Sequence, residues 1–119
     1  MFHLPRRMMI KKRREFQRVY AQGKSYANRY LVLYVFPAAG LGGKVGFAAG
    51  KKLGCAPKRN RAKRLLRECY RLHQAQLREG WACLLVARRN LIQARFQDAE
   101  KAYLSLLRRA KIYTREHIS

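Results

Sequence analysis

Residues 51–71 read KKLGCAPKRNRAKRLLRECYR, and the architecture of this chain depends on how this segment packs. Nine of its 21 side chains are Lys or Arg and one is acidic, yet apolar residues recur within it at helical spacing. The spacing predicts a helix over roughly residues 58–77 with one apolar side. That side consists of Ala62, Leu65, Leu66, Cys69 and Leu72. Cations occupy the other side, so we expect a helix that docks on a core and presents its charge to a polyanion.

The overall charge agrees with this interpretation. The 119 residues contain 28 Lys and Arg against 6 Asp and Glu, which gives a formal charge of +22 and a pI of about 11.1. Self-repulsion at this density opposes a compact state, so a partner of opposite charge is the simplest explanation. Nucleic acid is the first candidate, because neutralising its phosphates releases condensed counterions. A merely solvated basic surface is the alternative.

Length and composition predict one domain over residues 1–119, with a basic arm at 1–12 and a tail at 111–119 that are less ordered. No apolar run approaches the ~20 residues that cross a bilayer. The first residues are basic but lack the apolar segment of a secretion signal. Cys55, Cys69 and Cys83 are odd in number and not closely paired, as in a reduced protein. We therefore expect a cytoplasmic protein with no membrane partner.

Apolar periodicity and turn residues predict an α+β fold, a single-domain sandwich in which helices pack on one small mixed sheet. The expected order is αβββαβα: helix 13–22, strands 24–27, 30–36 and 44–50, helix 58–77, strand 81–87 and helix 94–110. Gly40, Gly42 and Gly43 predict a hairpin that pairs strand 44–50 antiparallel to strand 30–36. Strand 81–87 is apolar without alternation, which indicates a central strand covered on both faces.

The start of the basic helix has an unusual distribution of charge. Lys58, Arg59 and Arg61 lie near its first turn, where cations oppose the helix macrodipole. Positive charge is favourable there if an anion occupies the helix N-terminus, where backbone N–H groups are unpaired and Pro57 sets the entry. We expect phosphates to be held at this end of the helix. A solvated amphipathic helix is the alternative.

Aromatic residues form a second pattern. Phe16 and Tyr20 lie one helical turn apart, and alternation in the next long strand puts Tyr30, Val32, Tyr34 and Phe36 on one face. On the strand that follows, the same alternation groups Gly46, Ala48 and Gly50, whose small side chains would leave a groove floor, and Lys52 continues that phase. A shallow channel with aromatic walls and cations at its rim suits single-stranded RNA. Alternatively, Phe16, Val19 and Tyr20 simply cap the sheet as core.

Candidates for catalysis by the protein are weak. His3, His73 and His117 are scattered, and His73 lies on the apolar side of the basic helix. The six carboxylates are spread along the chain, so we expect neither a catalytic residue nor a metal site in the protein. Glu68 more plausibly braces Arg64 or Arg71, one turn away.

The basic segment closely resembles the signature of the bacterial ribonuclease P protein subunit. The matching residues are Lys51, Lys52, Gly54, Ala56, Arg59, Asn60, Arg61, Lys63, Arg64, Arg67, Glu68 and Arg71. Further matches follow in order along almost the whole chain, at Phe16, Tyr20, Gly23, Asn28, Leu31 to Tyr34, Val45, Gly46 and Val86 to Arg88. Gly50 departs from the pattern, since Ser is common there, and so does Pro57, where Val is common.

The resemblance implies the protein subunit of a ribonucleoprotein endoribonuclease that removes the 5′ leader of precursor tRNA. The catalysis belongs to magnesium ions held by a catalytic RNA, and no obligate protein partner is expected. By analogy, the residues that bind the catalytic RNA are Lys58, Arg59, Asn60, Arg61, Lys63, Arg64, Arg67 and Arg71. Those expected to bind the leader are Phe16, Tyr20, Val32, Tyr34, Ala48, Gly50 and Lys52. The family fold also has a left-handed βαβ crossover at the basic helix, whereas general rules favour a right-handed one in about 98% of cases.

Two other classes share the charge and the aromatic pattern. A ribosomal or RNA-chaperone protein would lack a single catalytic RNA partner, and a DNA-binding protein could place the basic helix in a major groove. The chain shows neither a helix-turn-helix pair nor a dimer zipper. A cationic membrane-surface protein is disfavoured, because the apolar side of the helix is needed by the sheet.

Overall fold

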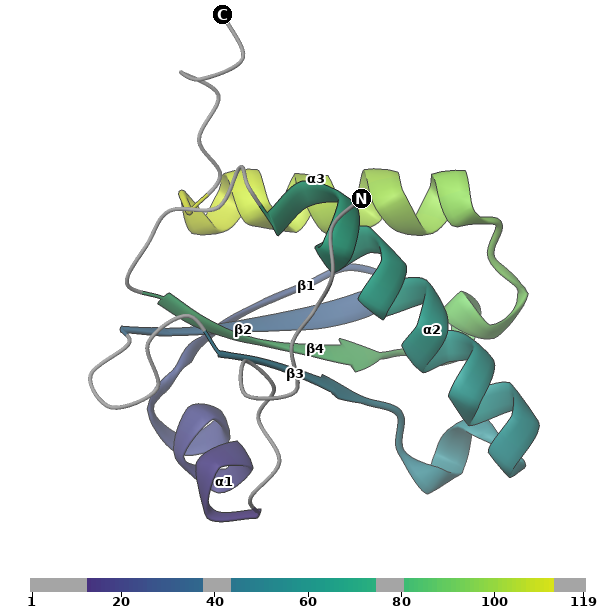
Figure 1. Ribbon diagram of the computed structural model, residues 1–119, viewed down its shortest axis with the longest axis horizontal. Coiled ribbons are helices and arrows are strands. Elements are labelled where there is room, and N and C mark those ends of the chain that lie inside the picture. The colour runs from purple at the N-terminus through teal and green to yellow at the C-terminus, as the bar shows by residue number, and fades with distance from the viewer. Residues whose placement is uncertain (1–12, 38–43, 75–80, 113–119) are drawn as a thin grey trace, which may run out of the picture.

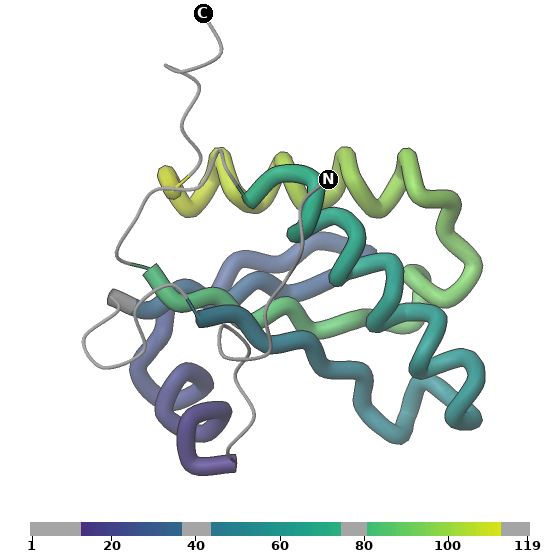
Figure 2. Tube along the Cα trace, viewed as in Figure 1, coloured from purple at the N-terminus to yellow at the C-terminus, as the bar shows by residue number. Residues whose placement is uncertain are grey.

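The computed structural model describes residues 13–37, 44–74 and 81–112, and the chain folds as two helical layers around one sheet (Figures 1 and 2). The helices and strands are α1 (Arg13–Gln22), β1 (Lys24–Ala27), β2 (Leu31–Pro37), β3 (Val45–Ala48), α2 (Ala56–His73), β4 (Trp81–Ala87) and α3 (Phe96–Ala110). Two 3-10 turns, η2 (Lys51–Leu53) and η4 (Arg89–Gln93), follow β3 and β4. The predicted order αβββαβα and the α+β class are confirmed. The predicted arm and residues 113–119 of the predicted tail lie outside the described residues.

The sheet has the strand order β1-β2-β4-β3. β2 pairs antiparallel with both β1 and β4, whereas β3 pairs parallel with β4. The predicted hairpin between β2 and the strand that follows it is therefore wrong, because β4 lies between them. β4 is apolar along its whole length and takes the centre of the sheet, where both faces can be covered, while the shorter β3 is left at the edge.

The crossover from β3 through α2 to β4 is left-handed. In Figure 1, β3 is the edge strand nearest the viewer, β3 and β4 both point to the right, and α2 crosses above the sheet. A right-handed connection would have put α2 on the lower face, where α1 lies. The handedness thus leaves that lower face to α1 alone among the described helices.

The upper face of the sheet carries the main core. Alternate residues of β2, Leu31, Leu33 and Val35, point to this face and are buried beneath α2 and α3. The largest fully buried side chain is Tyr103 of α3. Asn28 connects the β1–β2 turn to α3, because its side-chain amide donates a hydrogen bond of 3.1 Å to the carbonyl of Ala102.

The basic helix docks on this core with a slightly different register from the one predicted. It begins two residues earlier than expected, and residues 75–77 of the predicted span lie outside the described residues. Leu72, expected on the apolar side, is 41% exposed, whereas Tyr70 is buried with its ring edge-on to Phe47 at 5.9 Å. Tyr70 and Leu72 lie about 200° apart around the helix axis, so burial of Tyr70 leaves Leu72 outside the contact.

The lower face is covered only in part by the described residues. Val19 of α1 is fully buried against Phe36, Ala82 and Leu84. Val86, one alternation further along β4, is half-buried, so the prediction that this strand is covered on both faces holds for its first part only. A strip of sheet beyond α1 thus remains accessible.

Candidate nucleic-acid interface

The start of α2 is open to an anion. Cys55 is the N-cap residue and makes no side-chain capping bond, Pro57 occupies the first turn, and that turn contains no acidic side chain. Gly54 precedes it with a φ of 124°, a conformation that residues with a side chain rarely adopt. The chain therefore turns sharply from η2 into the helix, and Lys58 follows with its side chain exposed.

Half of the eight residues predicted to bind the catalytic RNA have their polar groups unengaged. Within the part of the chain that the structure describes, no hydrogen bond or ion pair is made by the side chains of Lys58, Asn60, Lys63 and Arg64. Lys58, Asn60 and Arg64 are exposed and Lys63 is half-buried. These side chains are free to meet phosphates.

The other four are held by the protein itself. Arg59 donates to the carbonyl of Ala49 over 3.2 Å, and Arg67 lies over the ring of Phe47 at 5.5 Å. Arg61 donates to the carbonyls of Ile92 and Ala94, so it links α2 to η4 as well as carrying charge. These contacts fix where the guanidinium groups lie before any ligand arrives.

Arg71, the fourth of these, pairs with Glu68. Its Nε donates to one carboxylate oxygen over 3.1 Å, and its terminal nitrogen contacts the other. The hydrogen bond from Arg71 lowers the pKa of Glu68 from its ordinary value. Of the two partners predicted for Glu68, the structure shows Arg71.

The second surface, which we call the aromatic face, is formed by Phe16 and Tyr20 of α1 and Tyr34 of β2. The Tyr20 and Tyr34 rings meet edge-on with centroids 4.9 Å apart. Tyr20 is 44% exposed and Phe16 is partly buried, whereas Val19 between them is fully buried. The alternative prediction, that this side of α1 only covers the core, is thus correct for Val19. The ring of Tyr20 remains available for stacking. Burial, and secondarily Tyr34, raises the pKa of the Tyr20 hydroxyl.

A row of half-buried side chains continues the aromatic face across the sheet. Val32 pairs with Val86, and Val86 pairs with Ala48, so the row runs through three adjacent strands. Val86 was not among the residues predicted to bind the leader. Its position two and four residues after Leu84 and Ala82 places it on the same face of β4 and could have identified it. Gly50 lies beyond the end of β3, exposed, and a Cβ built there would meet open space.

α1 is held at this place by the close approach of its C-terminal end to β2 and by two side-chain contacts. The backbone N–H of Gly23 donates to the carbonyl of Val19 over 2.8 Å, and a Cβ at Gly23 would lie 2.6 Å from that oxygen and 3.0 Å from the carbonyl of Val35. Glu15 pairs with Lys44 next to β3 at 3.2 Å. The Arg18 guanidinium lies 5.1 Å over the Phe36 ring, a cation beside the aromatic face that the sequence did not single out.

Lys52, the last predicted leader contact, lies in η2 rather than in the row of the sheet. It lines a cavity of about 590 Å³ together with Lys58 and Arg89. The structure thus brings one residue from each predicted group into a single cavity, and it adds Arg89, which sequence reasoning missed.

Groups suited to protein catalysis do not gather in the described part of the chain. There, no three His, Cys, Asp or Glu side chains come together as metal ligands. His73 is paired with Glu100 of α3, Nε2 to Oε2 at 2.7 Å, and His3 and His117 lie outside the described residues. None of the helices described is long and apolar enough to span a membrane.

The sequence is similar to those of known proteins over most of its length. The Ribonuclease P family model matches residues 4–111. The chain is 44% identical over 108 residues to the ribonuclease P protein component of Symbiobacterium thermophilum, covering 90% of this chain and 94% of that protein. Its identity to the same component of Caldanaerobacter subterraneus subsp. tengcongensis is 38% over 104 residues, covering 87% and 90% of the two chains.

Solved structures show the same fold. The Staphylococcus aureus RNase P protein superposes with a TM-score of 0.80 at 30% identity, covering 90% of this chain and 98% of that one. The RNase P protein from Thermotoga maritima superposes with a TM-score of 0.74 at 27% identity, covering 85% and 96%.

Proposed function

This chain belongs to the ribonuclease P protein family, and from that premise we propose that it is the protein subunit of a ribonuclease P that matures tRNA 5′ ends. The chain acts together with the RNA subunit of that enzyme. In the finer form of the proposal, the protein binds the catalytic RNA through α2 and the single-stranded 5′ leader of precursor tRNA through the aromatic face.

One observation carries this division. The cations of α2 and the aromatic face belong to helices that pack on opposite faces of the sheet, as Figure 1 shows. A protein with one such surface would bind a single RNA segment, whereas two separated surfaces suit two segments at once.

The basic surface supports the catalytic RNA as its partner. Lys58, Asn60 and Arg64 are exposed and unengaged within the described residues, while Arg59 and Arg67 are fixed in place. Point charges combined with oriented guanidinium groups suit the phosphate backbone of a structured RNA, which is recognised largely by its shape.

The aromatic face supports the leader as its ligand. A single strand can lay a base on an exposed aromatic ring, and stacking of this kind contributes about 1–3 kcal/mol per base with little sequence preference. Tyr20 offers such a ring, and the half-buried row from Val32 to Ala48 continues the accessible surface across the sheet.

Cleavage is assigned to magnesium ions held by the RNA subunit. The described residues gather no set of acidic or imidazole ligands that would hold a metal, and His73 is already paired with Glu100. The protein's own contribution is to bind and align the two RNAs. Its three free cysteines suit a reducing compartment such as the cytoplasm, and no other protein is required in this proposal.

Reconstitution tests this function. The purified protein should leave precursor tRNA intact, and addition of the catalytic RNA with Mg²⁺ at low salt should give cleavage at the mature 5′ end, faster than with the RNA alone. Cleavage by the pure protein without RNA would refute the proposed division of labour.

A further inference from the structure

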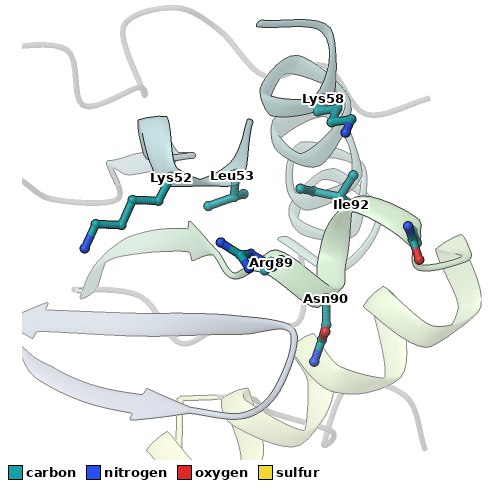
Figure 3. Close-up of a pocket in the computed structure, with 7 residues that line it drawn as sticks. Lys52, Leu53, Lys58, Arg89, Asn90 and Ile92 are labelled. Atoms are coloured by element: carbon teal, nitrogen blue, oxygen red, sulfur yellow. The ribbon is translucent and has the colours of Figure 1, made fainter. Parts of the chain in front are cut away.

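A cavity of about 590 Å³ lies where η2, the start of α2 and η4 meet (Figure 3). Its cationic side chains come from all three segments: Lys52 from η2, Lys58 from α2 and Arg89 from η4. The side chains of Asn90 and Gln93 also line it, and Leu53 and Ile92 form its apolar part.

All charged side chains that line the cavity are positive. Three of its lining residues are cationic and none is acidic, and among the described residues the three cations have no hydrogen-bond or ion-pair partner. Two other cavities, of about 410 and 320 Å³, both include Asp98 in their lining. Positive side chains that line one cavity without an acidic neighbour stabilise an anion placed among them.

The three segments are held together by contacts that do not use these cations. Arg61 of α2 donates to the carbonyls of Ile92 and Ala94 and so fixes η4 against α2. Gly54 lets η2 turn into α2, and a Cβ placed there would lie 3.2 Å from Cδ of Lys58. The three segments that carry the charges are thus held together by the fold before a ligand binds.

We propose that this cavity is a phosphate-binding subsite for an RNA backbone, with Lys52, Lys58 and Arg89 as its charged ligands. The proposal rests on the proposed function and deepens it. A phosphodiester suits the site because its charge matches the cations while Asn90 and Gln93 can donate to its oxygens. The apolar floor of Leu53 and Ile92 excludes water from one side and strengthens these interactions.

The subsite contains one residue from each group of predicted RNA contacts. Lys52 was predicted to bind the leader and Lys58 to bind the catalytic RNA. The phosphate can therefore come from either RNA. Two binding measurements distinguish these sources: affinity of the protein for the catalytic RNA, and affinity of the assembled holoenzyme for precursor tRNA with and without its leader.

The decisive variant is Arg89→Gln, because Arg89 is exposed and its replacement leaves the core intact. Lys101→Gln on α3 is the matched control, since Lys101 is also exposed and lines one of the cavities that contain Asp98. Each variant removes one positive charge. Arg89→Lys restores the charge and should recover most of the affinity.

We expect Arg89→Gln to weaken one of the two binding steps about five- to tenfold at low salt. The slope of log K against log salt should fall by about 0.7–0.9, as when one phosphate contact is lost. A leader phosphate would affect only precursor tRNA that carries its leader, whereas a phosphate of the catalytic RNA would affect assembly. Lys101→Gln should leave both slopes unchanged.

If Arg89→Gln matches Lys101→Gln in affinity and slope for both RNAs, the subsite is refuted. Failure of the proposed function has a different signature, namely a wild-type protein that binds RNA but does not support cleavage with the catalytic RNA. In that case the comparison of the two variants on the bound RNA still decides the subsite.

Discussion

Nη1 of Arg61 donates a hydrogen bond of 2.7 Å to the carbonyl oxygen of Ile92, and its second terminal nitrogen reaches the carbonyl of Ala94. The two acceptors lie more than 30 positions further along the chain and belong to the segment that precedes α3. A residue expected to bind RNA therefore also connects two elements of the fold.

Arg61→Ala should lower the free energy of unfolding by about 1–2 kcal/mol, because two hydrogen bonds from a charged group are lost at a partly exposed site. Arg64→Ala, which removes the same type of side chain from the same helix, should change it by less than about 0.5 kcal/mol. Urea denaturation of both variants measures the difference. Equal losses would mean that the carbonyl contacts of Arg61 contribute nothing.

Gly23→Ala should destabilise the domain by about 1–3 kcal/mol, the usual range for overpacking. The new methyl group would meet the carbonyls of Val19 and Val35, and both are backbone atoms that cannot move alone. The end of α1 must then shift away from β2, which displaces Tyr20 from Tyr34. Gly50→Ala is the control, since open space surrounds that position. Thermal unfolding and the near-ultraviolet circular dichroism of the tyrosines would register the change, and a wild-type result for Gly23→Ala would contradict the close approach.

Tyr20→Ala should weaken binding of leader-bearing precursor tRNA to the holoenzyme by about five- to 150-fold, the equivalent of one base stack of 1–3 kcal/mol. Binding of leaderless tRNA should stay the same. Leu72→Ala is a suitable control, because Leu72 is similarly exposed but lies on α2, away from the aromatic face. An equal loss of affinity for tRNA with and without the leader would show that Tyr20 does not bind the leader.

Gly50→Ser should raise the free energy of unfolding by about 0.5–1 kcal/mol. Gly50 has extended backbone angles that any residue adopts, it is the N-cap of η2, and nothing lies near its would-be Cβ. Serine would restrict the unfolded chain and place a hydroxyl where it can cap the turn. Gly54→Ser should have the opposite sign, because φ at Gly54 is 124°. Urea denaturation of the pair tests this, and a loss of stability for both would contradict it.

At pH 8, iodoacetamide should modify Cys55 alone in the native protein. Cys55 is exposed, whereas burial raises the pKa of the Cys69 and Cys83 thiols to about 12 each. The thiolate is the reactive form, so at pH 8 only about one in 10⁴ of such buried thiols is ionised. Cys69 and Cys83 should stay unmodified at pH 9 as well, because burial holds the pKa of each thiol at about 12. Mass spectrometry would show one adduct before denaturation and three after it; two or more adducts on the native protein would contradict the burial.

Much of this architecture follows from local sequence. The alternation of Leu31, Leu33 and Val35 against Val32 and Tyr34 correctly separates the two faces of β2. Pro57 and the apolar spacing around Leu66 correctly locate the basic helix. These features depend on neighbours within one or two turns of the chain, which is why periodicity reveals them.

What the sequence did not predict depends on distant partners. The alternation of β3 suits a hairpin with β2 as well as a parallel pair with β4, and the outcome depends on the apolar strand β4, which lies between β2 and β3. The exposure of Leu72 follows from the packing of Tyr70 on Phe47, a residue of another element. Likewise, Arg89 joins Lys52 and Lys58 only because η4 and η2 are neighbours in space.

The strand order has a consequence for how this protein is made. β4 comes last among the strands in sequence but lies between β2 and β3 in the sheet. While the chain emerges from the ribosome, β1 and β2 can pair early, yet β3 and the apolar side of α2 have no partner until residues 81–87 have been synthesised. Such long-range pairing forms slowly, because the loop between the partners must close first. The four-stranded sheet can therefore be completed only after residue 87 has been synthesised.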